Sequence, residues 1–144
     1  MFRFRKKTED SFMENDPEKV AADAERLYRS GRMNCAEAVL AAVTRKFMPD
    51  AGDEMARIAA GFGGGSGAGC ICGAVVGGTM AFGLIFANDR KRVQRLTKEL
   101  HRWFKDEYGA TCCKVILQTH KKICYELTGK VAGKVAQMLT QCHI

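Results

Sequence analysis

Cysteine is the residue type best able to do chemistry in this chain of 144 residues, which contains seven of them. Thiols bind metals and exchange disulfides, and an odd number cannot all close into disulfides within one chain. The basic N-terminus is not followed by an apolar stretch, so we expect no secretory signal and a reducing, cytoplasmic location. In such a compartment cysteines more often serve metal binding or redox chemistry than structural disulfides. The seven are Cys35, Cys70, Cys72, Cys112, Cys113, Cys124 and Cys142.

Two of the cysteines stand where helices are expected to begin. Asn34, with Glu37 three residues later, forms a capping-box pattern that places Cys35 at the first position of a helix. Cys72 follows the glycine-rich stretch 61–69 and begins an apolar run. Free backbone N–H groups and the positive end of the helix dipole lower the pKa of a thiol at such a position. We therefore expect a helix-start cysteine, Cys72 before Cys35, to be the most reactive thiol.

A second group of potential ligands lies towards the C-terminus. If one helix covers about residues 110–127, His120 and Cys124 fall within about 20° of Cys113 around its axis. His120 and Cys124 are one helical turn apart, a spacing that allows both to bind one metal ion. The same face carries apolar residues, so it also fits a stripe packed on the core.

The elements that must position these residues are predicted to be helices throughout. Apolar residues recur at helical spacing, and no strand pattern, linker or repeat interrupts the chain. We expect helices at about 17–30, 35–47, 52–60, 72–87, 89–109, 110–127 and 128–142. The sequence therefore predicts an all-α fold, a single compact bundle of six or seven helices with a glycine-rich loop before a buried central helix. Residues 1–13 would be a flexible basic arm and residues 14–144 a single helical, cysteine-rich domain.

The central stretch 58–88 contains 31 residues without a charge, ten of them glycine. Its continuous apolar part, residues 73–87, has 15 residues, short of the ~20 that a membrane span needs. We therefore expect a buried helix and no membrane insertion. Gly73 and Gly77 stand four residues apart on this helix. Glycine lets backbone approach closely, so the two are candidates for packing on a neighbouring helix or for binding a cofactor.

Charge and surface composition point away from nucleic acid. The net charge of +7 is distributed over several segments, and no face collects enough of it to form a nucleic-acid surface. We expect no nucleic-acid partner. The small residues of the central helix would suit a homodimer face.

The cysteine pattern resembles the C-GCAxxG-C-C family of redox-active proteins. That family is marked by an early cysteine, a central Cys-Gly-Ala-x-x-Gly and two later cysteines. Here these correspond to Asn34-Cys35-Ala36, to Cys72-Gly73-Ala74-Val75-Val76-Gly77, to Cys113 with Cys112 as the alternative, and to Cys124. The resemblance covers about residues 20–140. It implies redox activity and supplies no substrate; Cys70, Cys112 and Cys142 are additions to the pattern.

Two functions would share one site, at which we expect Cys35, Cys72, Cys113 and Cys124 to converge. The favoured one is thiol–disulfide or electron-transfer chemistry, as in a thiol oxidoreductase. Cys35 or Cys72 would attack, and Cys113 or Cys124 would resolve the mixed disulfide with a redox partner protein or small thiol. The alternative is a metal-binding module in which the four thiolates, with His120 as a substitute, hold zinc or an iron–sulfur cluster. A third possibility involves no shared site: the chain is a helical scaffold without a cofactor, and its cysteines fill a core.

Overall fold

The computed structural model describes residues 16–142, and almost all of its elements are helical. In chain order they are α2 (Pro17–Arg29), α3 (Cys35–Phe47), η1 (Pro49–Ala51), η2 (Asp53–Phe62), η3 (Gly65–Gly69), α4 (Gly73–Ile85), α5 (Arg90–Tyr108), α6 (Cys113–Thr119) and α7 (Cys124–Gln141). Within these residues the extended pairing is a single antiparallel bridge between Ile71 and Cys112. The all-α prediction is confirmed. The predicted arm at residues 1–13 lies outside the described residues.

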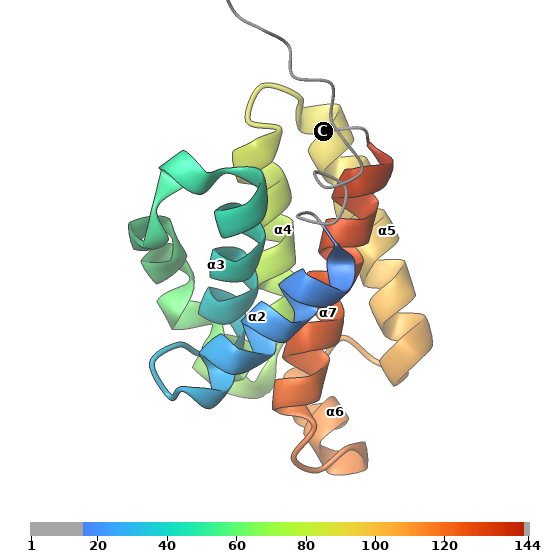
Figure 1. Ribbon diagram of the computed structural model, residues 1–144. Helices are drawn as coiled ribbons and strands as arrows, with labels where there is room; N and C mark the ends of the chain where they lie inside the picture. Colours follow the sequence, from blue (N-terminus) through green and yellow to red (C-terminus); the bar gives the residue numbers. More distant parts are fainter. Residues whose placement is uncertain (1–15, 143–144) are drawn as a thin grey trace, which may run out of the picture.

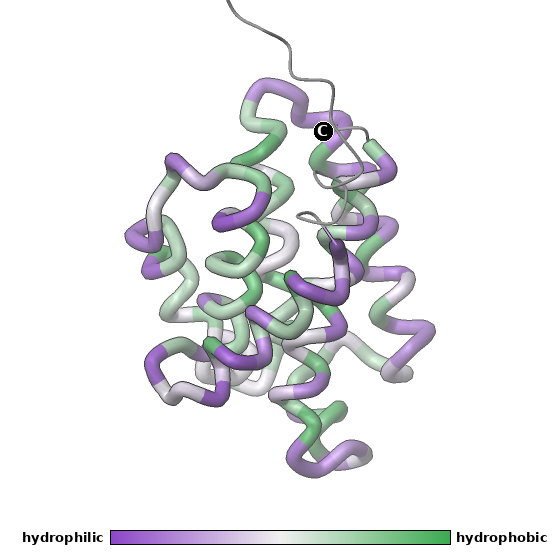
Figure 2. Tube along the Cα trace, in the orientation of Figure 1, coloured by the Kyte–Doolittle hydropathy of each residue, from purple (hydrophilic) through white to green (hydrophobic). Residues whose placement is uncertain are grey.

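The helices share one apolar core, in which α3, α4 and α7 carry most of the buried residues. Figure 1 shows α2 lying across α3 and α7, with α5 on the far side of α7. Every residue from Ala38 to Val43 is 0% exposed, so α3 is enclosed on all sides. In α5, Leu96, Leu100 and Phe104 are buried while most other positions are polar, as the purple stretches in Figure 2 show. This apolar stripe attaches α5 to the core, since burying one such side chain contributes about 1.5–3 kcal/mol.

Polar side chains cap the starts of α2, α3 and α5, and the capping box predicted at Asn34 is confirmed. The Asp16 carboxylate accepts a hydrogen bond from Glu18 N at 2.9 Å. Asn34 Oδ1 accepts from Glu37 N at 3.0 Å, and the Glu37 carboxylate accepts from Asn34 N at 3.1 Å. Asp89 caps α5 in the same way. These side chains satisfy backbone donors that have no partner within the helix, which fixes where α2, α3 and α5 begin.

The buried central helix is confirmed as α4. A Cβ on Gly77 would collide with the Ala36 carbonyl oxygen, so glycine at this position permits the close crossing of α3 and α4. A Cβ on Gly78 would meet the Val135 side chain at 2.8 Å and the Leu100 side chain at 2.9 Å, so α4 also packs closely on side chains of α7 and α5. No helix among the described residues is both long and apolar enough to span a bilayer.

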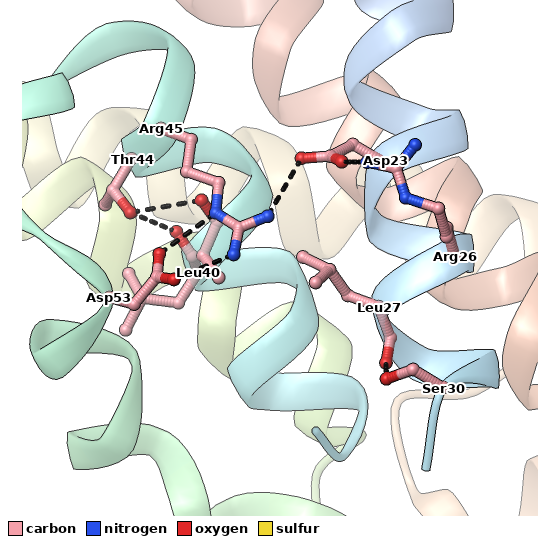
Figure 3. A network of polar contacts seen from close by, with 9 residues as sticks. Asp23, Arg26, Leu27, Ser30, Leu40, Thr44, Arg45 and Asp53 are labelled. Atoms are coloured by element: carbon pink, nitrogen blue, oxygen red, sulfur yellow. Dashed lines mark hydrogen bonds and ion pairs between the residues drawn. The ribbon is translucent and has the colours of Figure 1, made fainter. Parts of the chain in front are cut away.

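The chain between α3 and α4 runs through η2, a tighter 3₁₀ helix where a short α-helix was predicted. Arg45 of α3 donates to Asp53 at 2.9 and 2.8 Å, and its guanidinium lies 3.8 Å from the Asp23 carboxylate of α2 (Figure 3). The Arg45 guanidinium holds the pKa of the Asp53 carboxyl below its usual value. At the other end of η2, Asn34 Nδ2 donates to the Ala60 carbonyl at 2.7 Å. Both ends of η2 are therefore fixed to α3.

One predicted element is wrong: no single helix covers residues 110–127. The chain forms α6, ends it at Thr119, and begins α7 at Cys124. Lys122, in the turn between them, has a φ of 62°, a left-handed conformation that a continuous helix does not contain. No glycine or proline marks this break in the sequence. As a result, Cys113 and Cys124 belong to different helices.

Candidate thiol site

The four cysteines singled out from the sequence line one cavity of about 320 Å³. We call this cavity the thiol pocket. Its lining residues are Tyr28, Asn34, Cys35, Ala60, Gly63, Gly64, Cys72, Cys113, Ile116, Leu117, Cys124 and Leu127. None of these lining side chains carries a formal charge in its usual state. The fold thus brings together thiols from distant parts of the chain, while their chemical role stays a prediction.

Each of the four pocket cysteines stands at the beginning of a helix. Cys35, Cys113 and Cys124 are the first residues of α3, α6 and α7, and Cys72 is the residue before α4. The sequence predicted this position for Cys35 and Cys72 only, because it treated Cys113 and Cys124 as parts of one helix. Backbone N–H groups at helix starts lack intrahelical partners and favour negative charge on a nearby sulfur.

Burial acts against this effect and is the larger influence. It raises the pKa of the Cys72 thiol to about 12, although backbone hydrogen bonds from Ala74 and Val75 lower it in part. The Cys35 pKa is also raised by burial, while hydrogen bonds from the Gly64 and Ala36 N–H groups lower it. The expectation that the helix start gives Cys72 a lowered pKa is therefore wrong. Its sulfur is too deeply buried for the helix terminus to compensate.

The thiols also lie within electrostatic reach of one another. In addition to burial, negative charge on Cys124 raises the pKa of Cys35 and of Cys113. Charge on Cys35 likewise raises the pKa of Cys72 and of Cys113. Because like charges in an apolar cavity repel strongly, a second thiolate costs more than the first. The pocket therefore favours neutral thiols with at most one thiolate at a time.

The β-bridge determines which of the two adjacent cysteines enters the pocket. Ile71 and Cys112 face each other in the bridge, and Cys113 N donates to the Cys70 carbonyl at 2.5 Å. Successive residues of extended backbone point to opposite sides. Cys113 accordingly lines the pocket, whereas the Cys112 thiol donates to the Gly69 carbonyl at 2.9 Å. The same bridge holds the end of the glycine-rich loop beside α6.

The two glycines named as cofactor-binding candidates pack against α3 and η2. A Cβ on Gly73 would stand 2.6 Å from Cys35 Sγ and 2.6 Å from the Phe62 carbonyl oxygen. Gly77 meets the carbonyl of Ala36, as described above. Neither glycine is among the pocket-lining residues. Their close approach to neighbouring backbone is confirmed, and a role in binding a cofactor stays a prediction.

The other candidate ligands lie away from the pocket lining. His120 is exposed at the end of α6, with its ring nearly perpendicular to that of Tyr108 at a centroid distance of 6.2 Å. Cys70 is exposed, and Cys142 stands at the end of α7. Over residues 16–142, no three His, Cys, Asp or Glu side chains form a group arranged to hold a metal ion. The metal-ligand set of four cysteines and His120 stays a prediction without geometric support here.

Tyr28 is a pocket residue that the sequence analysis did not identify as functional. Burial raises the pKa of its hydroxyl, and charge on Cys124 and a hydrogen bond with that thiol raise it further. Tyr28 lies near the end of α2. Its neighbour in the pocket comes from the last helix, so no local motif could have revealed the contact.

Comparison with known families agrees with this arrangement of cysteines. Residues 33–138 match the model of the family described as "Putative redox-active protein (C_GCAxxG_C_C)". The match covers well over half of the chain and includes all four pocket cysteines, so the chain belongs to this family. No match was found among curated proteins or among solved structures.

Proposed function

We propose that the chain is a thiol–disulfide redox protein and that the thiol pocket is where it reacts. The observation that carries the proposal is the convergence of four cysteines on one cavity without a charged side chain in its lining. A dithiol and a disulfide are both neutral, so exchange between them leaves no net charge in the pocket. Such a reaction suits a site where each thiolate raises the pKa of its neighbours.

Cys35 is the best candidate for the attacking thiol. It is half-buried rather than fully buried, and N–H groups of Gly64 and Ala36 stabilise its thiolate. It lines the same cavity as Cys72 and Cys113, and its charge raises the pKa of both thiols. Cys124 is the thiol whose charge acts on Cys35, so it is the best candidate for the resolving partner.

The proposed exchange proceeds in two steps with an external disulfide as the oxidant. The Cys35 thiolate, after losing its proton to solvent, attacks one sulfur of the external disulfide and forms a mixed disulfide. The other external sulfur leaves as a thiolate and takes up a proton. The Cys124 thiol then loses its proton and attacks the Cys35 sulfur, which releases the second external thiolate for protonation. Two electrons pass to the external disulfide, and the protein retains a Cys35–Cys124 disulfide.

Single serine substitutions test this assignment. We would treat the reduced protein with 2-hydroxyethyl disulfide, which is small and uncharged, and follow the products by mass spectrometry. Cys35→Ser should abolish formation of the protein disulfide. Cys124→Ser should instead accumulate the mixed disulfide on Cys35, because the resolving thiol is missing. Cys72→Ser and Cys113→Ser should retain most of the rate, with Cys70→Ser outside the pocket as the matched control.

A different pattern of results from these substitutions would contradict the redox proposal. If all four pocket substitutions reduce function equally, and the unmodified protein purified without oxygen contains zinc or iron, the cysteines act as metal ligands. A metal site needs all of its ligands at once, whereas a redox pair needs two.

A further inference from the structure

Exposed apolar residues of the described chain stand close in sequence to residues that line the thiol pocket. Six large hydrophobic residues are at least 36% exposed, namely Ile58, Phe62, Ile71, Val115, Leu117 and Tyr125. Each lies within two positions along the chain of a pocket-lining residue, and Leu117 is itself part of the lining. Consecutive Cα atoms are 3.8 Å apart, so these side chains start within about 8 Å of the pocket lining. We call these six residues, together with the exposed cations Arg32, Lys114 and Lys122, the pocket rim.

Three exposed cations belong to the same rim. Arg32, Lys114 and Lys122 are each within two positions of a lining residue and have no acidic partner among the described residues. Of the acidic residues equally near, Glu37 is engaged in the capping box of α3, which leaves Glu126 as the nearby free carboxylate. The rim therefore combines exposed apolar surface with net positive charge.

We propose that the pocket rim is the docking surface for an acidic protein that presents a disulfide to the thiol pocket. This inference rests on the proposed redox function. A cavity of about 320 Å³ admits a disulfide and its nearest atoms, so the bulk of a protein carrying that disulfide must rest on the rim. Exposed apolar side chains gain from being covered, and unpaired cations select a partner of opposite charge.

Two other occupants of the pocket rim, a second copy of this chain and an anionic membrane, fit these features less well. A second copy of this chain, with a net charge of +7, would bring cationic rims together. An anionic membrane would satisfy the cations and the apolar residues, but it would bring no disulfide to the thiols. An acidic, disulfide-bearing protein meets the apolar, electrostatic and chemical features of this end of the molecule together. Figure 1 shows α6, which carries Lys114, Val115 and Leu117, projecting from one end of the bundle.

Binding is measured first, without any redox step. The probe is a short peptide with leucine and several glutamates flanking two serines that replace a cysteine pair, and fluorescence anisotropy gives its Kd. Combining Arg32→Glu, Lys114→Glu and Lys122→Glu should weaken binding at least tenfold, and salt should weaken binding to the unmodified chain. The control combines Arg90→Glu, Lys91→Glu and Lys98→Glu, which are exposed on α5, and should leave the Kd unchanged. Circular dichroism confirms that both variants are folded.

Reaction rates are then compared for two oxidants. One is the same peptide with its two cysteines joined as a disulfide, and the other is 2-hydroxyethyl disulfide. Reversal of the rim charges should slow oxidation by the acidic peptide about tenfold and leave the rate with the uncharged disulfide unchanged. Leu117→Ser should also slow the peptide reaction, because the peptide loses an apolar contact on the rim.

The outcomes separate the two proposals. If the uncharged disulfide reacts but rim reversal changes neither the Kd nor the rate of the acidic peptide, the docking surface is refuted and the redox function stands. If the serine peptide binds through the rim but no disulfide reacts at the pocket, docking stands and the redox function fails. If the peptide does not bind while vesicles containing phosphatidylserine bind through the rim cations, the surface serves a membrane and the docking proposal is wrong.

Discussion

The two walls of the thiol pocket are built differently. The α3–α4 wall supplies Cys35 and Cys72 from two helices whose backbones meet at glycines, and Cys72 is only 6% exposed. The α6–α7 wall supplies Cys113 and Cys124 from a seven-residue helix and the first turn of the next, with exposed residues on α6. One wall is therefore fixed by close packing and the other by a backbone bridge and a turn. More than half of the pocket rim lies on the second wall, namely Lys114, Val115, Leu117, Lys122 and Tyr125.

Among the changes that distinguish the two walls, substitution of Gly77 should have the largest effect on stability. In Gly77→Ala, the new Cβ would collide with the Ala36 carbonyl, which belongs to helix backbone and cannot rotate away. We expect the free energy of unfolding to fall by about 3 kcal/mol, as for overpacked cores. Urea denaturation measures this change. The thiol pocket should also lose its shape, since α3 carries Cys35.

A control for this prediction lies on the same helix. A Cβ added at Gly83 would have no atom within 4 Å, so Gly83→Ala meets open space. Replacing a helical glycine there should stabilise the chain by about 0.5–1 kcal/mol. Equal effects of the two substitutions would show that the close crossing of α3 and α4 does not determine stability.

The second effect is the alkaline sensitivity of the α3–α4 wall. Burial raises the pKa of the Cys72 thiol from its ordinary 9.0 to about 12. Between these values the folded chain keeps a proton that the unfolded chain loses, so the free energy of unfolding decreases as the pH rises. From pH 9 to 10.5 the loss should be about 1.6 kcal/mol greater than in Cys72→Ala, because the unfolded thiol is half ionised at pH 9 and each full pH unit is worth about 1.4 kcal/mol.

Urea denaturation under reducing conditions at the two pH values measures this difference. The exposed thiol of Cys70 provides the matched control, and Cys70→Ala should retain the pH dependence of the unmodified chain. If Cys72→Ala loses as much stability over this range as the unmodified chain, the buried thiol is not responsible.

The smallest effect concerns the turn in the α6–α7 wall. Lys122 adopts a φ of 62°, which costs a residue with a Cβ about 1 kcal/mol or more. Lys122→Gly removes this cost but makes the unfolded chain more flexible, so we expect a net gain of about 0.5 kcal/mol. Thermal unfolding followed by circular dichroism measures it. Lys121→Gly, one position earlier, should instead destabilise the chain, and a similar result for both would contradict the assigned role of the turn.

Sequence patterns predicted the α3–α4 wall well and the α6–α7 wall poorly, and the reason is physical. Asn34 and Glu37 form a local capping box, and the apolar run at residues 73–87 has about the length of a buried helix, so local chemistry determines both. The break after Thr119 has no glycine or proline. It depends on packing against the rest of the bundle, which short-range patterns do not contain.

The chemistry of the site divides in the same way. The cysteine spacing and the family resemblance identified the four lining cysteines, because the residue type and its place in the motif can be read directly from the sequence. The raised pKa of Cys72 could not be predicted from its place at a helix start, since it depends on how deeply the fold buries it. The contact of Tyr28 with Cys124 joins α2 to α7, which are far apart in the sequence, so local patterns do not predict it.

The spread of the pocket thiols along the chain has a consequence for biosynthesis. Cys35 and Cys72 leave the ribosome well before Cys124, yet α7 must pack on α2 and α3 before the pocket closes. During synthesis the early thiols therefore lack the packing that encloses them in the folded chain. Cys70 and Cys72, separated by one residue, are then each other's nearest reactive neighbours. Completion of α7, which supplies Cys124 and Leu127 to the lining, completes the pocket that Cys72 also lines. Protection of the Cys72 thiol from alkylation during translation should therefore report when the last stage of folding takes place.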